Sequence, residues 1–471
     1  MRRTKIIATI GPKTRDVESI KKIITAGADA IRINFSHDTR EAHAETAKNV
    51  MEAREALGAP TALVLDTKGP EIRTGVLAGD TDIQLVAGGT IVLTTDEIEG
   101  TIERVSVTYA DLAKDLEVGS RVLVDDGLIE LKVTKIEGND LTCEIINGGL
   151  LGSRKGINIP DVFVNLPALT EKDILDIEMG VKVGFDYIAA SFIRCKEDVL
   201  QIREVLKKNG GEKIKIISKI ENRDGVNNID EILEVTDGIM VARGDLGVEI
   251  PAEEVPLVQK MLIQKSNELG IPVVTATQML ESMVKNPRPT RAEASDVANA
   301  VYDGTSAIML SGETAKGDYP YEAIQFMDRT ARTVESRPEV YHKFLGKKGK
   351  VSMTNAISYS ACTAAKELNA AAIVTVTKSG YTARSLSKYK PASPIIAYTL
   401  DPQIERQLNL VWGCQPKHID LDKKETDEVF AQSVAQAEKE GFVKKDDIVV
   451  LTAGVPIGVH STTNVLKVQY V

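Results

Sequence analysis

Cysteine is scarce in this sequence, and its spacing excludes two kinds of site. The 471 residues contain only Cys143, Cys195, Cys362 and Cys414, with no CxxC pair and no histidine at zinc-ligand spacing. We therefore expect reduced thiols in a reducing compartment. A chain of this length buries a sufficient core without disulfides or metal staples.

Long apolar runs and basic charge are also missing. The apolar run near the N-terminus extends only from Ile6 to Ile10, too short for a signal-peptide core, and no stretch approaches the ~20 apolar residues of a membrane span. Lys and Arg number 58 against 68 Asp and Glu, a net charge of −10, which disfavours binding to nucleic acid or anionic membrane. The sequence predicts a soluble cytoplasmic protein with neither partner.

Short runs rich in β-branched residues recur through the first 340 residues. The runs are Lys5–Ile10, Ala30–Phe35, Thr61–Asp66, Asp186–Phe192, Ile214–Ile220, Gly238–Ala242, Pro272–Ala276 and Ser306–Leu310. They are nearly continuous in apolar residues rather than alternating, which is typical of buried parallel strands. Eight such strands with crossover helices predict a closed (β/α)8 TIM barrel. The open doubly wound alternative lacks its GxGxxG turn.

Two other segments differ from this pattern. Residues 71–165 contain alternating runs at 121–125, 130–136 and 141–146 separated by Asp-Gly and Gly-Asn turns, which predict an inserted antiparallel β domain. After a basic stretch at 343–350, interpreted as an exposed linker, helices are expected at 356–368, 383–389 and 426–440 and strands at 372–377, 394–399, 447–453 and 465–471. We therefore expect a barrel of residues 1–69 and 168–340, an insertion of residues 70–167, and a C-terminal α/β domain of residues 341–471 with a mostly parallel sheet.

Charged side chains follow the carboxyl ends of the predicted barrel strands, where barrel enzymes place their chemistry. Any single Lys-x-Glu or Arg-x-Asp pair is usually a salt bridge. Burying charged side chains at the same end of nearly every strand is costly, however, and therefore indicates a functional site. Glu221 and Asp245 follow neighbouring strands, so their carboxylates can converge on one Mg²⁺. The cations that could bind phosphate beside them are Arg32, Arg73, Arg243 and Lys219.

A second group combines oxygen donors with one formal charge. It consists of Asn34, Ser36, Asp66 and Thr67. Such a group suits either a weakly charged cation or a hydrogen-bond cluster. Magnesium, phosphate and surrounding cations together indicate phosphoryl transfer. No Ser-His-Asp elbow, HExxH motif or Walker loop is present to favour another chemistry.

Long strings of this sequence resemble the pyruvate kinase family. They are TIGPKT, IRINFSH, LDTKGPEIRTG, KGINIP, AASFIR, IISKIEN, DGIMVARGDLGVEIP, TATQMLESMVKNPRPTRAEASDVANAV and IMLSGETAKGDYP, then TKSGYTAR to TTNVLKV. They occur in the family's order and cover essentially the whole chain. The resemblance implies phosphoryl transfer from phosphoenolpyruvate to ADP, giving pyruvate and ATP. It also implies a barrel with a small β-barrel-like lid, a homotetramer, and Mg²⁺ (or Mn²⁺) and K⁺ as cofactors.

The resemblance also implies a role for individual residues. Lys219, Arg32 and Thr277 would be catalytic, with Lys219 stabilising the moving phosphoryl group and the enolate and Thr277 near the carbon that is protonated. The substrate contacts would be Arg32, Lys219, Gly244, Asp245 and Thr277. Glu221 and Asp245 would hold magnesium. The potassium ligands would be Asn34, Ser36, Asp66 and Thr67, and the nucleotide contacts Asn34, His37, Arg73 and Lys155. Glu71 stands where the family's potassium-dependent members carry glutamate.

One loop of the C-terminal domain predicts regulation. It contains Thr377, Lys378, Ser379, Gly380 and Thr382, follows a predicted strand and opens a predicted helix, where free N–H groups and hydroxyls favour an anion. Taken alone, the string is as typical of an ordinary helix cap. It resembles the family's sugar-phosphate effector loop, which implies a phosphorylated effector. Because Tyr381 stands where some relatives carry Arg or Lys, the ligand stays open among fructose 1,6-bisphosphate, a sugar monophosphate and AMP.

Two other functions fit part of the pattern. A magnesium-dependent lyase or aldolase would explain Glu221, Asp245 and the arginines, but not the insertion, Lys219 or the potassium-type cluster. A catalytically silent metabolite-binding protein would have no need of Lys219 and Thr277. Formation of ATP from phosphoenolpyruvate and ADP separates all three.

Overall fold

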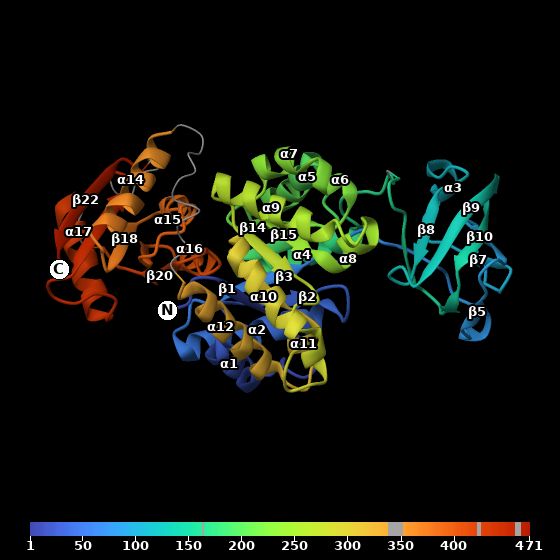
Figure 1. Ribbon diagram of the computed structural model, residues 1–471, viewed down its shortest axis with the longest axis horizontal. Coiled ribbons are helices and arrows are strands. Elements are labelled where there is room, and N and C mark those ends of the chain that lie inside the picture. The colour runs from blue at the N-terminus through green and yellow to red at the C-terminus, as the bar shows by residue number, and fades with distance from the viewer. Residues whose placement is uncertain (163, 338–351, 422–424, 457–462) are drawn as a thin grey trace.

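The computed structural model describes residues 1–162, 164–337, 352–421, 425–456 and 463–471. Its three bodies lie in a row, with the barrel in the middle, the C-terminal domain on one side and the inserted β domain, here called the lid, on the other (Figure 1). No helix among the described residues is long and apolar enough to cross a membrane.

Parallel strands close the central barrel, as the sequence predicted. Eight strands of the described chain run in the order β1-β17-β16-β15-β14-β13-β3-β2, and β1 pairs with both β17 and β2. Their bounds are β1 (Lys5–Ile10), β2 (Ala30–Asn34), β3 (Ala62–Asp66), β13 (Tyr187–Ala190), β14 (Lys215–Ile220), β15 (Gly238–Ala242), β16 (Val273–Ala276) and β17 (Ala307–Leu310). All end within two residues of the predicted bounds.

Helices form the outer layer of the barrel and share its core. They are α1 (Val17–Ala26), α2 (Arg40–Leu57), α4 (Glu171–Val183), α5 (Lys196–Lys208), α6 (Arg223–Asn227), α7 (Ile229–Val235), α8 (Arg243–Glu249), α9 (Val255–Leu269), α10 (Arg291–Asp303), α11 (Gly312–Ala315) and α12 (Pro320–Glu335), with a 3₁₀ turn, η2 (Glu281–Val284). Along β1, Ile6 and Ala8 pack toward the helices while Ile7 belongs to the barrel interior. This alternation explains why the strands are apolar on both faces.

The lid is inserted between β3 and α4. Its elements are β4 (Ile72–Arg73), η1 (Ala78–Asp80), β5 (Ile83–Leu85), β6 (Thr90–Thr94), β7 (Arg104–Ser106), α3 (Leu112–Asp115), β8 (Arg121–Val124), β9 (Ile129–Glu137), β10 (Asp140–Asn147), β11 (Gly149–Leu151) and β12 (Gly156–Asn158). The main sheet runs β4-β12-β8-β9-β10-β6-β7, and a bridge between Thr74 and Val107 joins its two edges into a barrel-like body. The prediction of an antiparallel domain was wrong in one place: β6 and β7 pair in parallel, because the chain crosses over between them instead of making a hairpin.

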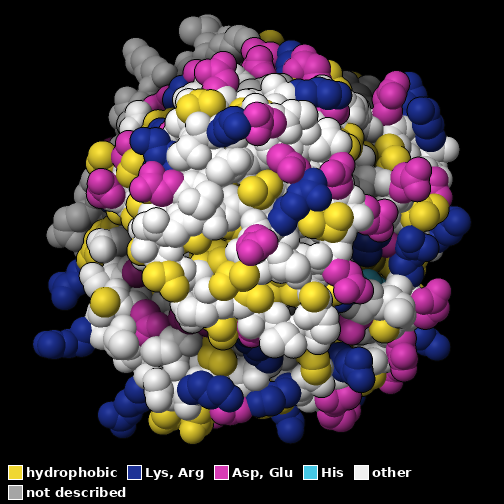
Figure 2. Space-filling model, turned by 90° about the vertical axis from the view of Figure 1, so that its right-hand side faces the viewer, with side chains coloured by type: hydrophobic (Ala, Val, Ile, Leu, Met, Phe, Trp, Pro, Cys, Tyr) yellow, Lys and Arg dark blue, Asp and Glu magenta, His cyan; other side chains and the backbone are white. Residues whose placement is uncertain are grey.

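The outer face of the lid carries apolar as well as charged side chains. Figure 2 looks at this end of the molecule and shows hydrophobic side chains gathered near the middle of the face. The lid residues Val86, Leu128 and Leu150 are all more than half exposed. Apolar surface here does not belong to the lid core, which lies inside the sheet.

The C-terminal domain has a five-stranded sheet in the order β20-β19-β18-β21-β22, parallel except for β22. Its elements are α14 (Met353–Glu367), β18 (Ala372–Val376), α15 (Tyr381–Ser387), β19 (Ile395–Thr399), α16 (Pro402–Leu408), β20 (Cys414–His418), α17 (Thr426–Lys439), β21 (Ile448–Ala453) and β22 (Val465–Tyr470). The sequence missed α16, which is seven residues long, and β20, whose Pro416 is tolerated because the strand is at the sheet edge. The predicted linker at 343–350 lies outside the described residues.

Candidate active site

The carboxyl ends of the barrel strands bring most of the predicted site residues to one place. In the register of the sheet Asn34 on β2 is paired with Asp66 on β3, so the two side chains start at the same level. Lys219 is the penultimate residue of β14, and Glu221 follows that strand directly. The lid follows the carboxyl end of β3, so these positions lie at the barrel end from which the lid extends.

Two cations and two carboxylates alternate at the centre of the site. Arg32 Nε donates to Asp66 Oδ2 at 2.6 Å, and Lys219 Nζ lies 3.2 Å from Asp66 Oδ1 and 2.8 Å from Glu221 Oε1. Asp66 and Glu221 are each 1% exposed. Buried charges of this kind are tolerated only when paired, and each carboxylate here has at least one cationic partner.

Electrostatics fixes the protonation of this cluster. Burial alone would raise the pKa of Asp66, but Arg32 and Lys219 outweigh it and hold that pKa below its ordinary value. Burial would likewise lower the pKa of Lys219, yet Asp66 and Glu221 raise it. The cluster therefore favours the charged forms of both Lys219 and Asp66.

Glu221 lies beside Asp245 and forms a two-carboxylate site. Its Oε2 accepts a hydrogen bond of 2.6 Å from the backbone N–H of Phe192, which orients the carboxylate. Burial raises the pKa of Glu221, and the negative charge of Asp245, in the first turn of α8, raises it further. A divalent cation between the two carboxylates would relieve this repulsion, so the residues fit Mg²⁺. No cluster of three or more His, Cys, Asp or Glu side chains suited to a metal occurs among the described residues.

The predicted potassium ligands are partly brought together. Asn34 Oδ1 accepts a hydrogen bond of 3.2 Å from the backbone N–H of Ser36, so these two residues form a compact turn beside Asp66. Thr67 follows Asp66, and its hydroxyl oxygen accepts a 3.1 Å hydrogen bond from the N–H of Ser191. The set therefore supplies oxygen atoms from two adjacent strand ends.

Thr277 and Gly244 form a third part of the site. Thr277 Oγ1 accepts from the Gly244 N–H at 2.7 Å and donates to the Ala276 carbonyl at 2.6 Å. Its φ of 69° is in the left-handed region, which is strained for a β-branched residue. A strained backbone conformation of this kind persists only where surrounding contacts hold the residue in place.

Arg243 supplies those contacts, and the expectation that its charge serves phosphate was wrong. Its guanidinium donates to the carbonyls of Ala276 at 3.2 Å and Thr277 at 2.8 Å, and to Asp296 at 2.7 Å. All three of its nitrogens thus engage protein groups. Arg243 holds the Thr277 backbone in place rather than presenting charge to a substrate.

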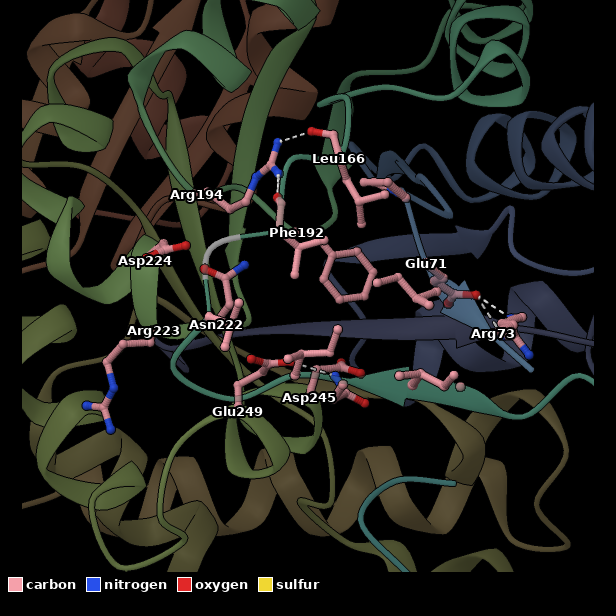
Figure 3. A pocket seen from close by; sticks show the side chains of 18 of the residues that line it. Glu71, Arg73, Leu166, Phe192, Arg194, Asn222, Arg223, Asp224, Asp245 and Glu249 are labelled. Atoms are coloured by element: carbon pink, nitrogen blue, oxygen red, sulfur yellow. Dashed lines mark hydrogen bonds and ion pairs between the residues drawn. The ribbon is translucent and has the colours of Figure 1, made fainter. Parts of the chain in front are cut away.

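The nucleotide residues divide into two groups. Arg73 and Lys155 line a cleft of about 490 Å³ between the lid and the barrel, which also contains Asp245 and Phe192 (Figure 3). Arg73 is paired with Glu71 at 2.7 Å, and Lys155 lies 3.0 Å from Asp125. His37 is exposed on the loop after β2.

Ser191 is a site residue that sequence reasoning missed. Its hydroxyl accepts from Lys219 Nζ at 2.7 Å and donates to the Thr67 carbonyl at 2.7 Å, so it joins the lysine to the predicted potassium group. The signal was present, because Ser191 and Phe192 lie in the family string AASFIR. A serine after a strand does not by itself indicate a function, because its role depends on which side chain of another strand it contacts.

The predicted effector loop follows β18. Thr377 is buried, Lys378 is exposed, and Gly380 has a φ of 77° as the N-cap of α15, which starts at Tyr381 instead of the expected Ala383. The Thr382 hydroxyl lies 2.8 Å from that of Thr463, which precedes β22. The first turn of α15 and the residue Thr463 before β22 therefore meet here.

Comparisons with known proteins agree with this geometry. The family model "Pyruvate kinase, barrel domain" matches residues 1–324, and "Pyruvate kinase, alpha/beta domain" matches residues 355–469. The pyruvate kinase of Clostridium acetobutylicum is 51% identical over the whole of both chains. That of Geobacillus stearothermophilus is 49% identical over all of this chain and 80% of its own length.

A solved structure supports the same assignment. The crystal structure of a pyruvate kinase from Cryptosporidium parvum has a TM-score of 0.94 and 42% identity, covering 100% of this chain and 96% of its own. Fold, site and sequence agree over all three bodies. The chain therefore belongs to the pyruvate kinase family.

Proposed function

We propose that this chain transfers the phosphoryl group of phosphoenolpyruvate to ADP, giving pyruvate and ATP as the last step of glycolysis. The observation that carries the proposal is the position of Lys219. It is a buried cation 3.2 Å from Asp66 and 2.8 Å from Glu221, at the mouth of a barrel whose neighbouring cleft contains Arg73 and Lys155. A fixed positive charge between a phosphate donor and acceptor is what phosphoryl transfer needs.

Each residue at the centre has a distinct role in this reaction. Arg32 and Lys219 bind the phosphate of phosphoenolpyruvate, and Lys219 neutralises charge on the phosphoryl group and on the enolate. Their shared partner Asp66 holds both cations in position at 2.6 and 3.2 Å. Gly244 binds substrate through its backbone, and Thr277 lies near the enolate carbon that receives a proton.

Two cations complete the proposed site. Glu221 and Asp245 would hold Mg²⁺ (or Mn²⁺), since they are a buried and a half-buried carboxylate that repel each other without a cation. When bound, the divalent ion withdraws charge from the phosphoryl and enolate oxygens. The potassium ligands would be Asn34, Ser36, Asp66 and Thr67.

The nucleotide would occupy the cleft between the lid and the barrel. Its volume of about 490 Å³ suits a ligand of this size. Arg73 and Lys155 line it, and Asn34 and His37 would contact the nucleotide from the barrel side. In this proposal the lid is residues 70–167, and the barrel is residues 1–69 and 168–340.

The C-terminal domain, residues 341–471, would regulate a cytoplasmic homotetramer. Its loop of Thr377, Lys378, Ser379, Gly380 and Thr382 would bind a phosphorylated effector. The support is the strand order of the sheet. After β18 the chain continues to β19 on one side, whereas the strand on the other side of β18 is β21. The loop after β18 therefore lies at the point where the strand order reverses direction. Ligands of open α/β sheets bind at such points.

The test is a turnover assay on the purified chain with phosphoenolpyruvate, ADP, Mg²⁺ and K⁺. We expect ATP and pyruvate to form in equal amounts, and neither to form when ADP is left out. A lyase or aldolase would consume the substrate without making ATP, and a silent binding protein would leave it unchanged. Either result would contradict the proposal.

A further inference from the structure

A second cavity lies at the opposite end of the barrel from the candidate active site. It has a volume of about 400 Å³ and lies between the amino-terminal ends of the barrel strands and the C-terminal domain. Tyr187 and Lys215, the first residues of β13 and β14, and the turn from Gly270 to Pro272 before β16 form the barrel wall. Helix α15 forms much of the other wall. No residue of the proposed catalytic cluster lines this cavity.

Lys388, the C-cap residue of α15, lies in the wall of this cavity and has no ion pair among the described residues. Its side chain is in the wall and the residue is only 8% exposed. Among the described residues its ammonium makes no hydrogen bond or ion pair within bonding distance, and it lies 5.5 Å from the centre of the Tyr389 ring. Burial lowers the pKa of Lys388, and Glu268 across the cavity opposes this only in part. A buried ammonium in this position is costly unless an anion joins it.

Gln407 is a further residue of the cavity wall, and the barrel backbone holds its amide in place. The residue is 3% exposed, and its Nε2 donates to the carbonyls of Lys213 at 2.7 Å and Asp186 at 3.2 Å. These bonds fix the amide plane, and Oε1 is left buried with no described hydrogen-bond donor. A buried acceptor without a donor costs roughly 1–3 kcal/mol. Because Oε1 has almost no accessible surface, a ligand in the cavity does not reach it, and the wall contributes charge rather than this acceptor.

The remaining charges favour an anion. Asp237 is already neutralised by Lys215 at 3.2 Å and Arg203 at 2.8 Å. Arg384, half-buried one helical turn before Lys388, adds a second cation to the wall. Glu268 is the one wall carboxylate, of those described, that these two cations face. The wall therefore has an excess of positive charge.

We propose that this cavity binds a small oxyanion. The oxyanion pairs with Lys388 and Arg384, which both line the cavity. A volume of about 400 Å³ is in the range of small-molecule sites and accommodates a hydroxycarboxylate or a phosphate. The inference does not depend on the proposed reaction, since the cavity is at the other end of the barrel.

The single tryptophan of the chain makes this site measurable. Trp412 is buried and lines a small adjoining cavity together with Lys388, Arg384 and the Gly270–Pro272 turn. A ligand paired with Lys388 changes the electrostatic environment of the indole. We therefore propose a titration of the intact protein with L-malate, succinate and inorganic phosphate, followed by tryptophan fluorescence and by the melting temperature Tm.

We expect saturable binding of L-malate or phosphate below about 10 mM, with a rise in Tm. Succinate, which lacks only the hydroxyl of malate, should bind about as tightly as malate, because charge carries the binding. Malate and succinate alone would identify a carboxylate ligand, and phosphate alone a phosphate ligand.

Two variants separate this cavity from other anion sites. Lys388→Met should weaken binding of the responsive probe at least about tenfold, because a charged hydrogen bond is lost. The variant is expected to fold, since it removes a buried charge that has no counterion. The matched control is Lys439→Met, at an exposed lysine at the end of α17, which should bind like the parent.

Two results would overturn the proposal. One is the absence of any probe-induced change in both fluorescence and Tm up to about 20 mM. The other is unchanged affinity in Lys388→Met, which would assign the binding to a different site.

Discussion

At the scale of single residues, the central feature is a chain of contacts that fixes one lysine. Lys219 Nζ contacts Asp66, Glu221 and the hydroxyl of Ser191, and its aliphatic stem is enclosed, so the side chain is 11% exposed. The sequence predicted the two carboxylates, because charge at a strand end is conspicuous. It could not predict Ser191 or the true role of Arg243, since both depend on partners from distant strands.

The serine gives the first testable prediction. Ser191→Ala should lower kcat about tenfold with little change in KM, because the Lys219 ammonium loses a hydrogen bond that holds it in place. Steady-state kinetics with phosphoenolpyruvate and ADP would measure this. Ser218→Ala is the matched control, since the Ser218 hydroxyl is on β14 but bonds Thr236 at 2.8 Å, away from the site. Equal kcat in the Ser191 variant and the control would refute the role.

A second residue-scale prediction concerns the monovalent cation. Glu71 is negatively charged, and it is paired with Arg73 at 2.7 Å and with Lys68 at 3.7 Å. A lysine at this position would supply a positive charge in place of K⁺, and a glutamate does not. We expect activity to fall at least about tenfold when K⁺ is replaced by tetramethylammonium, which is too large for the oxygen cluster. The measurement is the initial rate at fixed ionic strength. Full activity without K⁺ would contradict this prediction.

At the scale of elements, the strength of the local signal decided what the sequence could predict. The barrel strands are uninterrupted β-branched runs buried on both faces, and their bounds were predicted within two residues. Helix α16 and strand β20 were missed because they are held by tertiary contacts: Arg406 Nε donates to the buried Asp186 at 2.9 Å, and β20 pairs with β19. Such contacts leave no periodic pattern in the sequence.

The loop before α15 carries a prediction at this scale. If it binds a phosphorylated effector, that effector should lower the apparent KM for phosphoenolpyruvate at least about fivefold. The probes are fructose 1,6-bisphosphate, glucose 6-phosphate and AMP. Lys378→Glu combined with Ser379→Ala should abolish the response and leave basal turnover intact, while Lys439→Glu should respond like the parent. If no probe shifts the saturation curve of the parent, the loop is only a helix cap.

At the scale of the whole molecule, the C-terminal domain is fastened to the barrel by buried polar contacts. Tyr187 donates to the Gln407 carbonyl at 2.6 Å, and Lys5 Nζ donates to the Cys414 carbonyl at 2.8 Å. Trp412 packs with barrel residues of α10 and α12. The lid also contacts the barrel, for example where Asn158 Nδ2 donates to Glu249 Oε1 at 2.8 Å, but an open cleft lies between these two bodies.

One lysine in this interface makes stability depend on pH. Burial lowers the pKa of Lys390 to about 7, with Glu335 opposing, and its ammonium lies 4.7 Å from the Trp412 ring. Between about pH 7 and the ordinary lysine pKa of about 10.4 the unfolded chain holds a proton that the folded chain lacks, so this group makes stability rise with pH. Below pH 7 both states hold the proton and the cost of the buried charge is constant.

The variant Lys390→Met tests that sign. At pH 7 its Tm should exceed the parent's by at least about 2 °C, and the difference should shrink as pH rises toward 10. Thermal denaturation at several pH values, with the exposed Lys439→Met as control, would measure it. A difference that grows with pH would show that Lys390 is stabilised as a cation.

The most direct test of the account is the kcat of Lys219→Met for ATP formation from phosphoenolpyruvate and ADP. Because the charge of Lys219 matters most as negative charge develops between donor and acceptor, the loss should fall on kcat, by at least about 10²–10³-fold, while phosphoenolpyruvate binding measured at equilibrium stays largely intact. Lys208→Met, at an exposed lysine ending α5, should keep the parent's rate. A Lys219→Met enzyme that retains half the parent kcat would contradict the central role of this residue.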